Sequence, residues 1–592
     1  MTIEQTLQEL TAQAVKTLYN LTIDPHTVTV NDTPKNFVGS YTVVVFPYTK
    51  AAAKNPEQVG KEIGQYLTDN LVFAQDFNVV KGFVNIELTN AYWLQTFTHI
   101  IHHENYGQAP ASGKKIALEY IGPNTNKPLH LGHIRNMFVG HAVAAILQAN
   151  GHEVHKVNIY NDKGINISKS MAAWVHAGNG ATPQSAGLKG DHFVGYYYVL
   201  YNKIATQQAA PYREQGMEPL EAEKLTPIYA LAQQFTQEWE QGKPSVRQLW
   251  QTMNGWVYEG FAETFNMLGI SYEKAYYESE CYELGKKLVL EGLANGAFFA
   301  KPDGSVWADF TNEGLDQKVL IRNDGTSVYI TQDIGVADLR YHDFTPDQLI
   351  YVVGDEQIYH FKVLKLTLQK LGKPYANLIY HLYYGMVDLP EGKMKSREGK
   401  VVDADDLIAE MLQTAEEQTR ELGKTEGMNP HQAQQLYKIL GLGALKYFIL
   451  KVNAQKRLLF NPRESIDLQG HTAPFIQYSY ARIRSILRKF NQNFLLPNYP
   501  INHLHPQEID LITEISRFRQ AIHTAAETYD PSVIANYAFT LAKSFNKLYA
   551  DLSVLNNPDE QTNTFRVALA YTTARTLKNA LHLLGIDVPE RM

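Results

Sequence analysis

Two short apolar runs with a helical pattern between them stand out in the first third of the chain. The run 116–120 predicts a buried strand, and the apolar spacing that continues to Ala149 predicts a helix closed by Asn150-Gly151. A second apolar run, 154–160, predicts another strand. In a strand–helix–strand unit of this kind, nucleotides bind in the crevice beyond the strand ends, where the helix N-terminus is positive.

The residues ahead of this unit predict a separate N-terminal domain. An amphipathic helix near 3–18 and strand-like stretches such as 41–46 and 81–87 indicate a compact α+β arrangement. Residues 108–114 have the proline, serine and glycine content of a linker. We therefore expect the first domain to cover residues 1–111.

The residues after this unit predict an inserted segment and a helical C-terminal domain. The stretch 164–314 is mostly helical and too long for one crossover, so we interpret it as an insertion, with the parallel sheet resuming at about Val319. From Asn461 the pattern is helical throughout. The predicted fold class is therefore α/β: a Rossmann-like parallel-sheet domain at 112–460 with a helical insertion, an N-terminal α+β domain, and a C-terminal all-α helical bundle at 461–592.

Composition and charge limit the class of protein. With 592 residues, 44% hydrophobic and 19% charged, the chain can bury several cores, as soluble multidomain enzymes do. The single cysteine, Cys281, excludes intramolecular disulfides and Cys-rich zinc sites. No apolar stretch has the length of a signal peptide core or a membrane span, which predicts a cytoplasmic protein. The net charge of −7 argues against indiscriminate nucleic-acid binding but leaves room for a local basic track.

The loop before the predicted helix carries candidate phosphate-binding chemistry. It has no G-x-G-x-x-G pattern, but Gly132 would let a flat base approach, and His130 and His133 would project from the first helical turn. Two such histidines alone are more often surface or core residues. Residues 161–164, after the second strand, either line the crevice or form a simple turn.

A second candidate lies in the basic, glycine-flanked segment 392–399, Gly-Lys-Met-Lys-Ser-Arg-Glu-Gly. It follows a strand-like run, 378–389, and precedes a helix that Asp403 would cap. A loop of this kind can close over a triphosphate and place donors where charge grows as pyrophosphate leaves. An isolated basic cluster is usually a solvated turn, so its meaning depends on the histidine motif.

Together the two segments resemble the signatures of class I aminoacyl-tRNA synthetases, and within that class the arginyl-tRNA synthetases. His-Leu-Gly-His133, preceded by Pro-Asn-Thr-Asn-Lys127, resembles the HIGH motif. Lys393-Met-Lys-Ser-Arg397 resembles the KMSKS motif, with its second lysine displaced by one position. Arginyl enzymes deviate similarly, and many carry a lysine just before the histidine motif, where Lys127 stands. The resemblance covers essentially the whole chain.

The resemblance implies a set of site residues. A guanidinium needs carboxylates around it, so Glu119, Tyr329 and Asp333 are expected at the arginine side chain. Asn124 and Gln357 are expected at its amino and carboxylate end. Catalytic roles are implied for Lys127, His130, His133, Lys393, Lys395, Ser396 and Arg397, and ATP contacts for Lys127, His130, Gly132, His133 and Met394. tRNA contacts are implied for Phe83, Asn85, Tyr478, Arg482, Tyr549 and Met592.

The resemblance also implies a reaction and its partners. The expected activity is ATP-dependent conversion of L-arginine to arginyl-adenylate, then transfer to the 3′-terminal adenosine of tRNA(Arg). Magnesium is expected to arrive with ATP, and neither a prosthetic group nor a protein-held metal is expected. The chain is expected to be monomeric. Two alternatives stay open: a synthetase for another amino acid, which would not need both Glu119 and Asp333, and a noncatalytic RNA-binding relative, which would be expected to lose motif residues.

Overall fold

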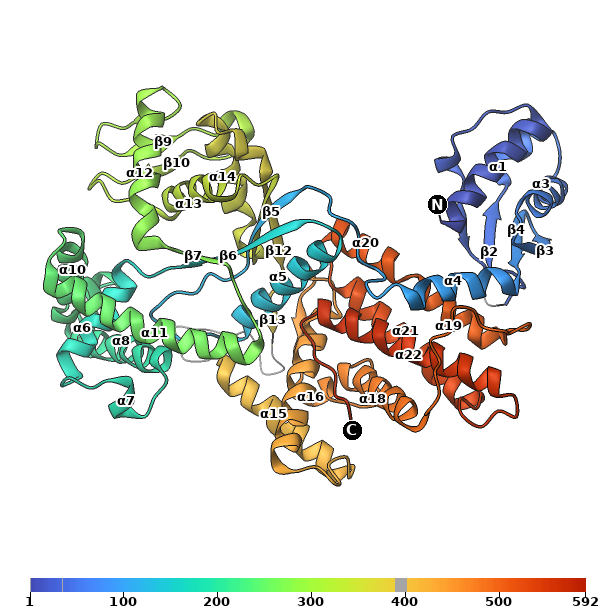
Figure 1. The fold of residues 1–592 in the computed structure, drawn as a ribbon. Helices are drawn as coiled ribbons and strands as arrows, with labels where there is room; N and C mark the ends of the chain where they lie inside the picture. Colours follow the sequence, from blue (N-terminus) through green and yellow to red (C-terminus); the bar gives the residue numbers. More distant parts are fainter. Residues whose placement is uncertain (1, 35, 389–401) are drawn as a thin grey trace. The chain divides into compact units, whose positions relative to one another are not determined.

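A computed structural model describes residues 2–34, 36–388 and 402–592 (Figure 1). The chain forms two compact units. One comprises the residues up to Tyr106 together with 486–517 and 543–573. The other comprises 107–485, 518–542 and 574–592.

The first unit contains an antiparallel sheet of four strands in the order β1-β2-β4-β3, as the strand pattern of the N-terminal region predicts. Helix α1 begins with a capping box between Thr2 and Gln5, and α3 packs on β3 and β4. A later helix, α19, packs on α4 in the same unit. The elements are α1 (Ile3–Tyr19), β1 (Val30–Asp32), β2 (Tyr41–Val44), α2 (Thr49–Ala52), α3 (Pro56–Asn70), β3 (Ala74–Val80), β4 (Phe83–Leu88), α4 (Asn90–His102) and α19 (Pro506–Ser516).

The second unit is built on a sheet of five parallel strands in the order β12-β11-β5-β6-β7. Helix α5 crosses from β5 to β6 and packs on β6, β11 and α16. Most of its residues are buried, which explains its apolar character on all sides. These elements are β5 (Lys115–Glu119), α5 (Leu131–Ala149), β6 (Glu153–Tyr160), β7 (Lys274–Tyr277), β11 (Gln348–Gly354) and β12 (Ile379–Tyr384). The prediction of a strand–helix–strand unit is confirmed, with bounds within one residue.

A helical segment lies between β6 and β7, as the insertion predicts. It ends earlier than residue 314, however, because β7 returns to the parallel sheet at Lys274. Strand β7, with the sequence Lys-Ala-Tyr-Tyr, is too short to show an apolar run, so the pattern did not mark it. The inserted helices are α6 (Ile165–Ala177), α7 (Pro183–Ala186), α8 (Gly190–Glu214), α9 (Pro219–Lys224), α10 (Pro227–Glu240) and α11 (Pro244–Leu268).

The prediction that the parallel sheet resumes near Val319 is wrong. Val319 lies in β10, in a separate antiparallel sheet ordered β10-β9-β8, and the next strand of the parallel sheet after β7 begins at Gln348. Tyr329 is the first residue of a helix, in which Ile330 and Ile334 are buried. The elements here are α12 (Glu278–Ala294), β8 (Phe299–Ala300), β9 (Val306–Ala308), β10 (Lys318–Ile321), α13 (Tyr329–Phe344) and α14 (Ile358–Lys370).

The remaining elements are mostly helical. Two-residue strands β13 and β14 pair in parallel, and from Asn461 on the chain forms helices, as predicted. The elements are β13 (Val387–Asp388), α15 (Ala404–Glu421), α16 (Pro430–Leu450), β14 (Leu458–Leu459), α17 (Pro462–Ser465), α18 (Ala473–Lys489), α20 (Phe518–Thr528), α21 (Ser532–Asp551) and α22 (Glu560–Leu583). No helix in the described ranges is both long and apolar enough to cross a membrane.

Candidate active site

Two histidines cap the N-terminus of α5, just beyond the carboxyl end of β5. Nδ1 of His130 accepts a hydrogen bond from the backbone N–H of Gly132 at 3.2 Å, and Nδ1 of His133 accepts one from the backbone N–H of His130 at 3.1 Å. The ring centroids lie 3.8 Å apart. Backbone donors that a helix start would leave without partners therefore hold both rings in place.

The same bonds determine which ring nitrogen carries a proton. Burial, aided by the charge of Lys127, lowers the pKa of His130 to about 4. Burial also lowers the pKa of His133 well below its usual value, and His130 adds to the effect. Both rings are therefore neutral at pH 7, and because each Nδ1 is an acceptor, each Nε2 carries the hydrogen. The pair presents two N–H donors at a positive helix end.

Gly132 lies directly against this pair. A Cβ at position 132 would approach the ring of His130 to 3.0 Å, so a larger residue would displace the ring. The group that lies close to the backbone at Gly132 is therefore the ring of His130. Contact of Gly132 with a nucleotide base stays a prediction.

The chain returns to the histidine motif immediately after the basic segment. The backbone N–H of Leu131 donates to the carbonyl of Val402 at 3.1 Å, and that of Ala404 donates to the carbonyl of Leu129 at 3.0 Å. Asp403 accepts from the first turn of α15, which confirms the predicted cap. Residues 402–404 thus lie beside the histidine pair. The predicted residues Lys393, Met394, Lys395, Ser396 and Arg397 lie outside the described ranges.

A buried arginine of α5 holds the strand that leads into the basic segment. Arg135 is fully buried and donates to the carbonyls of Met386 at 3.2 Å, Ala454 at 2.9 Å and Lys456 at 2.6 Å. Burial lowers its pKa to about 10, so it stays charged at pH 7. The helix that begins with the histidines therefore also positions the chain just before residue 389.

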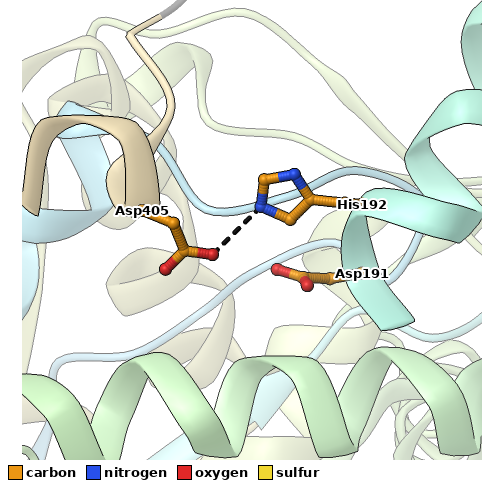
Figure 2. Close-up of side chains that lie close together, drawn as sticks. All are labelled: Asp191, His192 and Asp405. Carbon is orange, nitrogen blue, oxygen red and sulfur yellow. Dashed lines mark hydrogen bonds and ion pairs between the residues drawn. The ribbon is translucent and has the colours of Figure 1, made fainter. Parts of the chain in front are cut away.

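An ion-pair network holds the start of α15 to the inserted helices (Figure 2). Asp405 accepts hydrogen bonds from Nε2 of His192 at 3.0 Å, from Nζ of Lys189 at 2.6 Å and from Oγ1 of Thr264 at 2.9 Å. Burial opposes ionisation of Asp405, but the bonds from His192 and Lys189 outweigh it, and its pKa lies well below the usual value. Asp191, His192 and Asp405 are close enough to hold a metal ion, yet Lys189 also lies 3.4 Å from Asp191. Lysine thus supplies the positive charge between the two carboxylates.

Glu119, expected at the substrate guanidinium, already has a partner. Its carboxylate forms an ion pair with Arg340 of α13, and that guanidinium lies over the rings of Tyr276 and Tyr351, 5.1 Å from each centroid. Burial raises the pKa of Glu119, and Arg340 opposes that rise. The cation that this buried carboxylate needs is therefore supplied within the chain. A substrate contact at Glu119 stays a prediction.

The other predicted arginine contacts come from different elements. Tyr329, at the start of α13, is 70% exposed. Asp333, one turn later, accepts from Nε2 of His360 at 2.5 Å. Gln357 lies in the short 3₁₀ turn after β11. Asn124 is exposed and pairs with Asn161 in an isolated parallel bridge.

Glu278 is a candidate that the sequence analysis missed. It begins α12 at the carboxyl end of β7, is 6% exposed, and accepts a hydrogen bond from Gln332. Burial, together with the charges of Asp162 and Asp333, raises its pKa to about 7. Asp333 also contributes to the raised pKa of Glu119, so the charge of Asp333 opposes ionisation of both buried glutamates. The signal in the sequence is an acidic residue directly after a strand, but β7 itself was not recognised.

The segment 161–164 has a structural role at Asp162. This carboxylate is 1% exposed and accepts from the backbone N–H of Ser279 at 2.9 Å, from its hydroxyl at 2.8 Å, and from Tyr258 at 3.1 Å. It therefore fixes the start of α12, beside Glu278. The segment is therefore more than a simple turn, because Asp162 positions α12 and lies near Glu278. Whether it lines the catalytic crevice stays a prediction.

The predicted tRNA contacts in the first unit differ in exposure. Phe83 is 41% exposed on β4, whereas Asn85 is 2% exposed and bonds to Thr42 at 2.6 Å and Asn78 at 2.8 Å. Asn85 joins neighbouring strands and points inward, so its side chain is not exposed as that of Phe83 is; contact of either residue with tRNA stays a prediction. β4 is also an inner strand, not an edge. Tyr549, 42% exposed, stacks on Phe545.

The predicted contacts in the second unit include a tyrosine between cations. Lys424 lies 4.4 Å and Arg482 4.8 Å from the ring centroid of Tyr478. Hydrogen bonding from Arg482 and Lys424 lowers the pKa of Tyr478. Such a positive, aromatic surface suits phosphates and unpaired bases. Met592 is partly exposed at the chain end.

Comparisons with known proteins cover the whole chain. Residues 96–461 match "tRNA synthetases class I (R), catalytic domain", residues 476–592 match "DALR anticodon binding domain", and residues 5–88 match "Arginyl tRNA synthetase N terminal domain". Arginine–tRNA ligases of Amoebophilus asiaticus and Bacteroides fragilis are 50% and 49% identical over 100% of both chains. The Thermus thermophilus arginyl-tRNA synthetase structure has the same fold, with a TM-score of 0.76, 24% identity and full coverage of both chains. The chain belongs to the arginine–tRNA ligase family of class I aminoacyl-tRNA synthetases.

Proposed function

We propose that this chain joins L-arginine to tRNA(Arg) in two steps, at the site between the histidine pair and the acidic group. The observation that carries the proposal is the combination of two N–H donors on neutral histidines after β5 with the buried carboxylates of Glu119 and Glu278 at the ends of β5 and β7. Asp333 of α13 repels both of these carboxylates. The donors suit a triphosphate, and the carboxylates suit a guanidinium.

In the first step the arginine carboxylate attacks the α-phosphorus of ATP in line, and pyrophosphate leaves. Magnesium enters with ATP as part of the substrate. Nε2–H of His130 and of His133 donates to phosphate oxygens, and Lys127 with Lys393, Lys395, Ser396 and Arg397 neutralises charge on the leaving group, while Gly132 and Met394 contact the nucleotide. No protein nucleophile is needed, so positioning and charge stabilisation supply the catalysis.

Arginine selection follows from the carboxylates. We place the guanidinium against Asp333, Tyr329 and Glu278, with Glu119 behind them, and the amino and carboxylate groups against Asn124 and Gln357. Burial, with added repulsion from Asp162 and Asp333, raises the pKa of Glu278 to about 7, and a cation here would favour its ionised form. This assignment adds Glu278 to the residues expected from the sequence.

In the second step a hydroxyl of the 3′-terminal adenosine attacks the adenylate carbonyl, and AMP leaves. tRNA is proposed to contact Phe83, Tyr478, Arg482, Tyr549 and Met592, and Asn85 is proposed only to support the strand beneath Phe83. We further propose a monomeric, cytoplasmic enzyme with domains at 1–111, 112–460 and 461–592, in which adenylate formation waits for bound tRNA.

Charging of tRNA(Arg) with labelled arginine tests the proposal. Lysine is the matched control, because it carries the same charge without the planar guanidinium. We expect charging with arginine only, and a large loss in Asp333→Asn. Charging with lysine at a similar rate, or unchanged arginine KM in Asp333→Asn, would refute the assigned pocket.

A further inference from the structure

A second cavity lies in the unit that holds the active site, at the other end of α5. Its volume is about 410 Å³, within the ordinary range for small-molecule sites. Its walls include His141 of α5 and Lys156 near the amino end of β6. His141 is eleven residues beyond His130, which places it roughly 16 Å along the helix from the histidine pair. The cavity is therefore separate from the proposed catalytic groups.

Cationic side chains from several elements line this cavity. Lys156 comes from β6, Lys438 and Lys446 from α16, and His582 from the end of α22. Among the lining residues Asp587 is the one carboxylate. Lys438 makes no ion pair with any residue in the described ranges, and Lys156 donates to a neutral group, the hydroxyl of Ser271, at 2.9 Å.

Two of the lining side chains are buried and incompletely bonded. Lys446 is 7% exposed and donates to the carbonyl of Gly585. His141 carries a buried Nδ1 that has no hydrogen-bond partner among the described residues. A Cβ at Gly585, where φ is +68°, would lie 3.1 Å from the ring of His141 and 3.6 Å from Nζ of Lys446. Backbone that only glycine fits therefore lies directly over both groups.

The charges do not cancel within the cavity. Three lysines contribute three positive charges, and Asp587 removes one. The carboxyl ends of α11 and α22, at Leu268 and Leu583, each contribute about half a negative charge. The lining lysines and Asp587 together carry two net positive charges; these helix ends, and Glu273 near Lys156, reduce that excess. Burial lowers the pKa of Lys446 to about 8; Asp587 opposes this fall, and the charge of Lys438 adds a smaller contribution to it.

We propose that this cavity is a second anion site, which binds a phosphate group through Lys156, Lys438 and Lys446, beside the ring of His141. Phosphate oxygens accept several hydrogen bonds at once and suit ammonium donors. The phosphate can belong to a small phosphorylated compound or to the backbone of bound tRNA. Because the cavity touches α5, α16 and the C-terminal segment together, its ligand would hold these elements to one another.

Calorimetric titration of the full chain with inorganic triphosphate tests the site. The test variant is Lys156→Gln/Lys438→Gln, whose side chains are not buried. Lys287→Gln removes a charge on the exposed side of α12, away from the cavity, and is the matched control. His133→Ala controls for binding at the active site. We expect a saturable event that weakens at least tenfold in the double variant and persists in both controls, while the kcat for charging at saturating tRNA(Arg) is retained in the double variant.

The two sources of phosphate are separated by adding tRNA(Arg). If triphosphate still binds the tRNA complex, the site serves a small phosphorylated compound. If tRNA displaces triphosphate and the double variant binds tRNA more weakly than Lys287→Gln does, the phosphate is that of the RNA. Absence of saturable binding in the unaltered chain, or binding lost in His133→Ala and kept in the double variant, would overturn the proposal.

Discussion

Replacing Glu278 with glutamine tests two effects of this acid separately: its effect on the stability of the fold and its effect on arginine binding. Glutamine has nearly the same shape and can still accept the hydrogen bond from Gln332. It removes only the charge, which burial and the charges of Asp162 and Asp333 disfavour. The substitution therefore leaves the packing at the start of α12 intact.

The expected change in stability depends on pH. The pKa of Glu278 rises from 4.5 to about 7 in the folded chain. Because the folded pKa lies above the unfolded value, folding is favoured below about pH 4.5, and this contribution is lost as the pH rises through 7. A shift of about 2.5 units corresponds to roughly 3 kcal/mol, an upper limit. Glu278→Gln should therefore be more stable than the unaltered chain by about 1–3 kcal/mol near pH 8 and about equally stable near pH 4.

The same substitution should weaken arginine binding, although it stabilises the fold. If Glu278 meets the guanidinium, its loss removes a charge-assisted bond worth about 1.5–3 kcal/mol, so the KM for arginine should rise about 10- to 150-fold. Bound arginine favours ionised Glu278, so affinity in the unaltered chain should also fall below about pH 7.

Thermal unfolding of the ligand-free protein at both pH values measures the change in stability. Charging of tRNA(Arg) measures the arginine KM. Asp316→Asn, which removes an exposed carboxylate in the same unit, is the control for net charge. A variant less stable than the unaltered chain near pH 8, with an unchanged arginine KM, would show that Glu278 is a structural acid and refute the reasoning.

Three further substitutions test other parts of the site. His133→Ala should lower kcat by about two to three orders of magnitude, because it removes a transition-state donor, with little change in melting temperature; normal turnover would exclude that role. Lys189→Met should destabilise the chain by about 3 kcal/mol, because it leaves Asp405 without its ammonium partner. If Asp191, His192 and Asp405 were instead a metal site, the variant would bind divalent ions more tightly in calorimetry. Arg340→Met should cost about 3–5 kcal/mol in urea unfolding, since it leaves Glu119 buried and unpaired. Adding Glu119→Gln should recover much of that loss, and additive losses would contradict the pairing.

Local patterns predicted the centre of the fold well. The strand, helix and strand around the histidine motif are continuous in sequence, and each has the period of its structure, so β5, α5 and β6 were predicted within one residue. The cap at Asp403 was predictable for the same reason, since a cap is a contact between near neighbours.

Long-range contacts explain what the sequence did not reveal. Arg340 lies far along the chain from Glu119, so nothing local shows that they pair. β7 has four residues and becomes recognisable only through its pairing with β6, which also hides the position of Glu278. Asn85 has the polar character of a surface residue, and its burial follows from partners on two other strands.

Arginine-dependent exchange of labelled pyrophosphate into ATP tests the central claim most directly. The exchange should be measured with each of the twenty amino acids, with and without tRNA(Arg). We expect exchange with arginine alone, dependent on tRNA, and lost in His133→Ala. Exchange with another amino acid, or none under any condition, would contradict that claim.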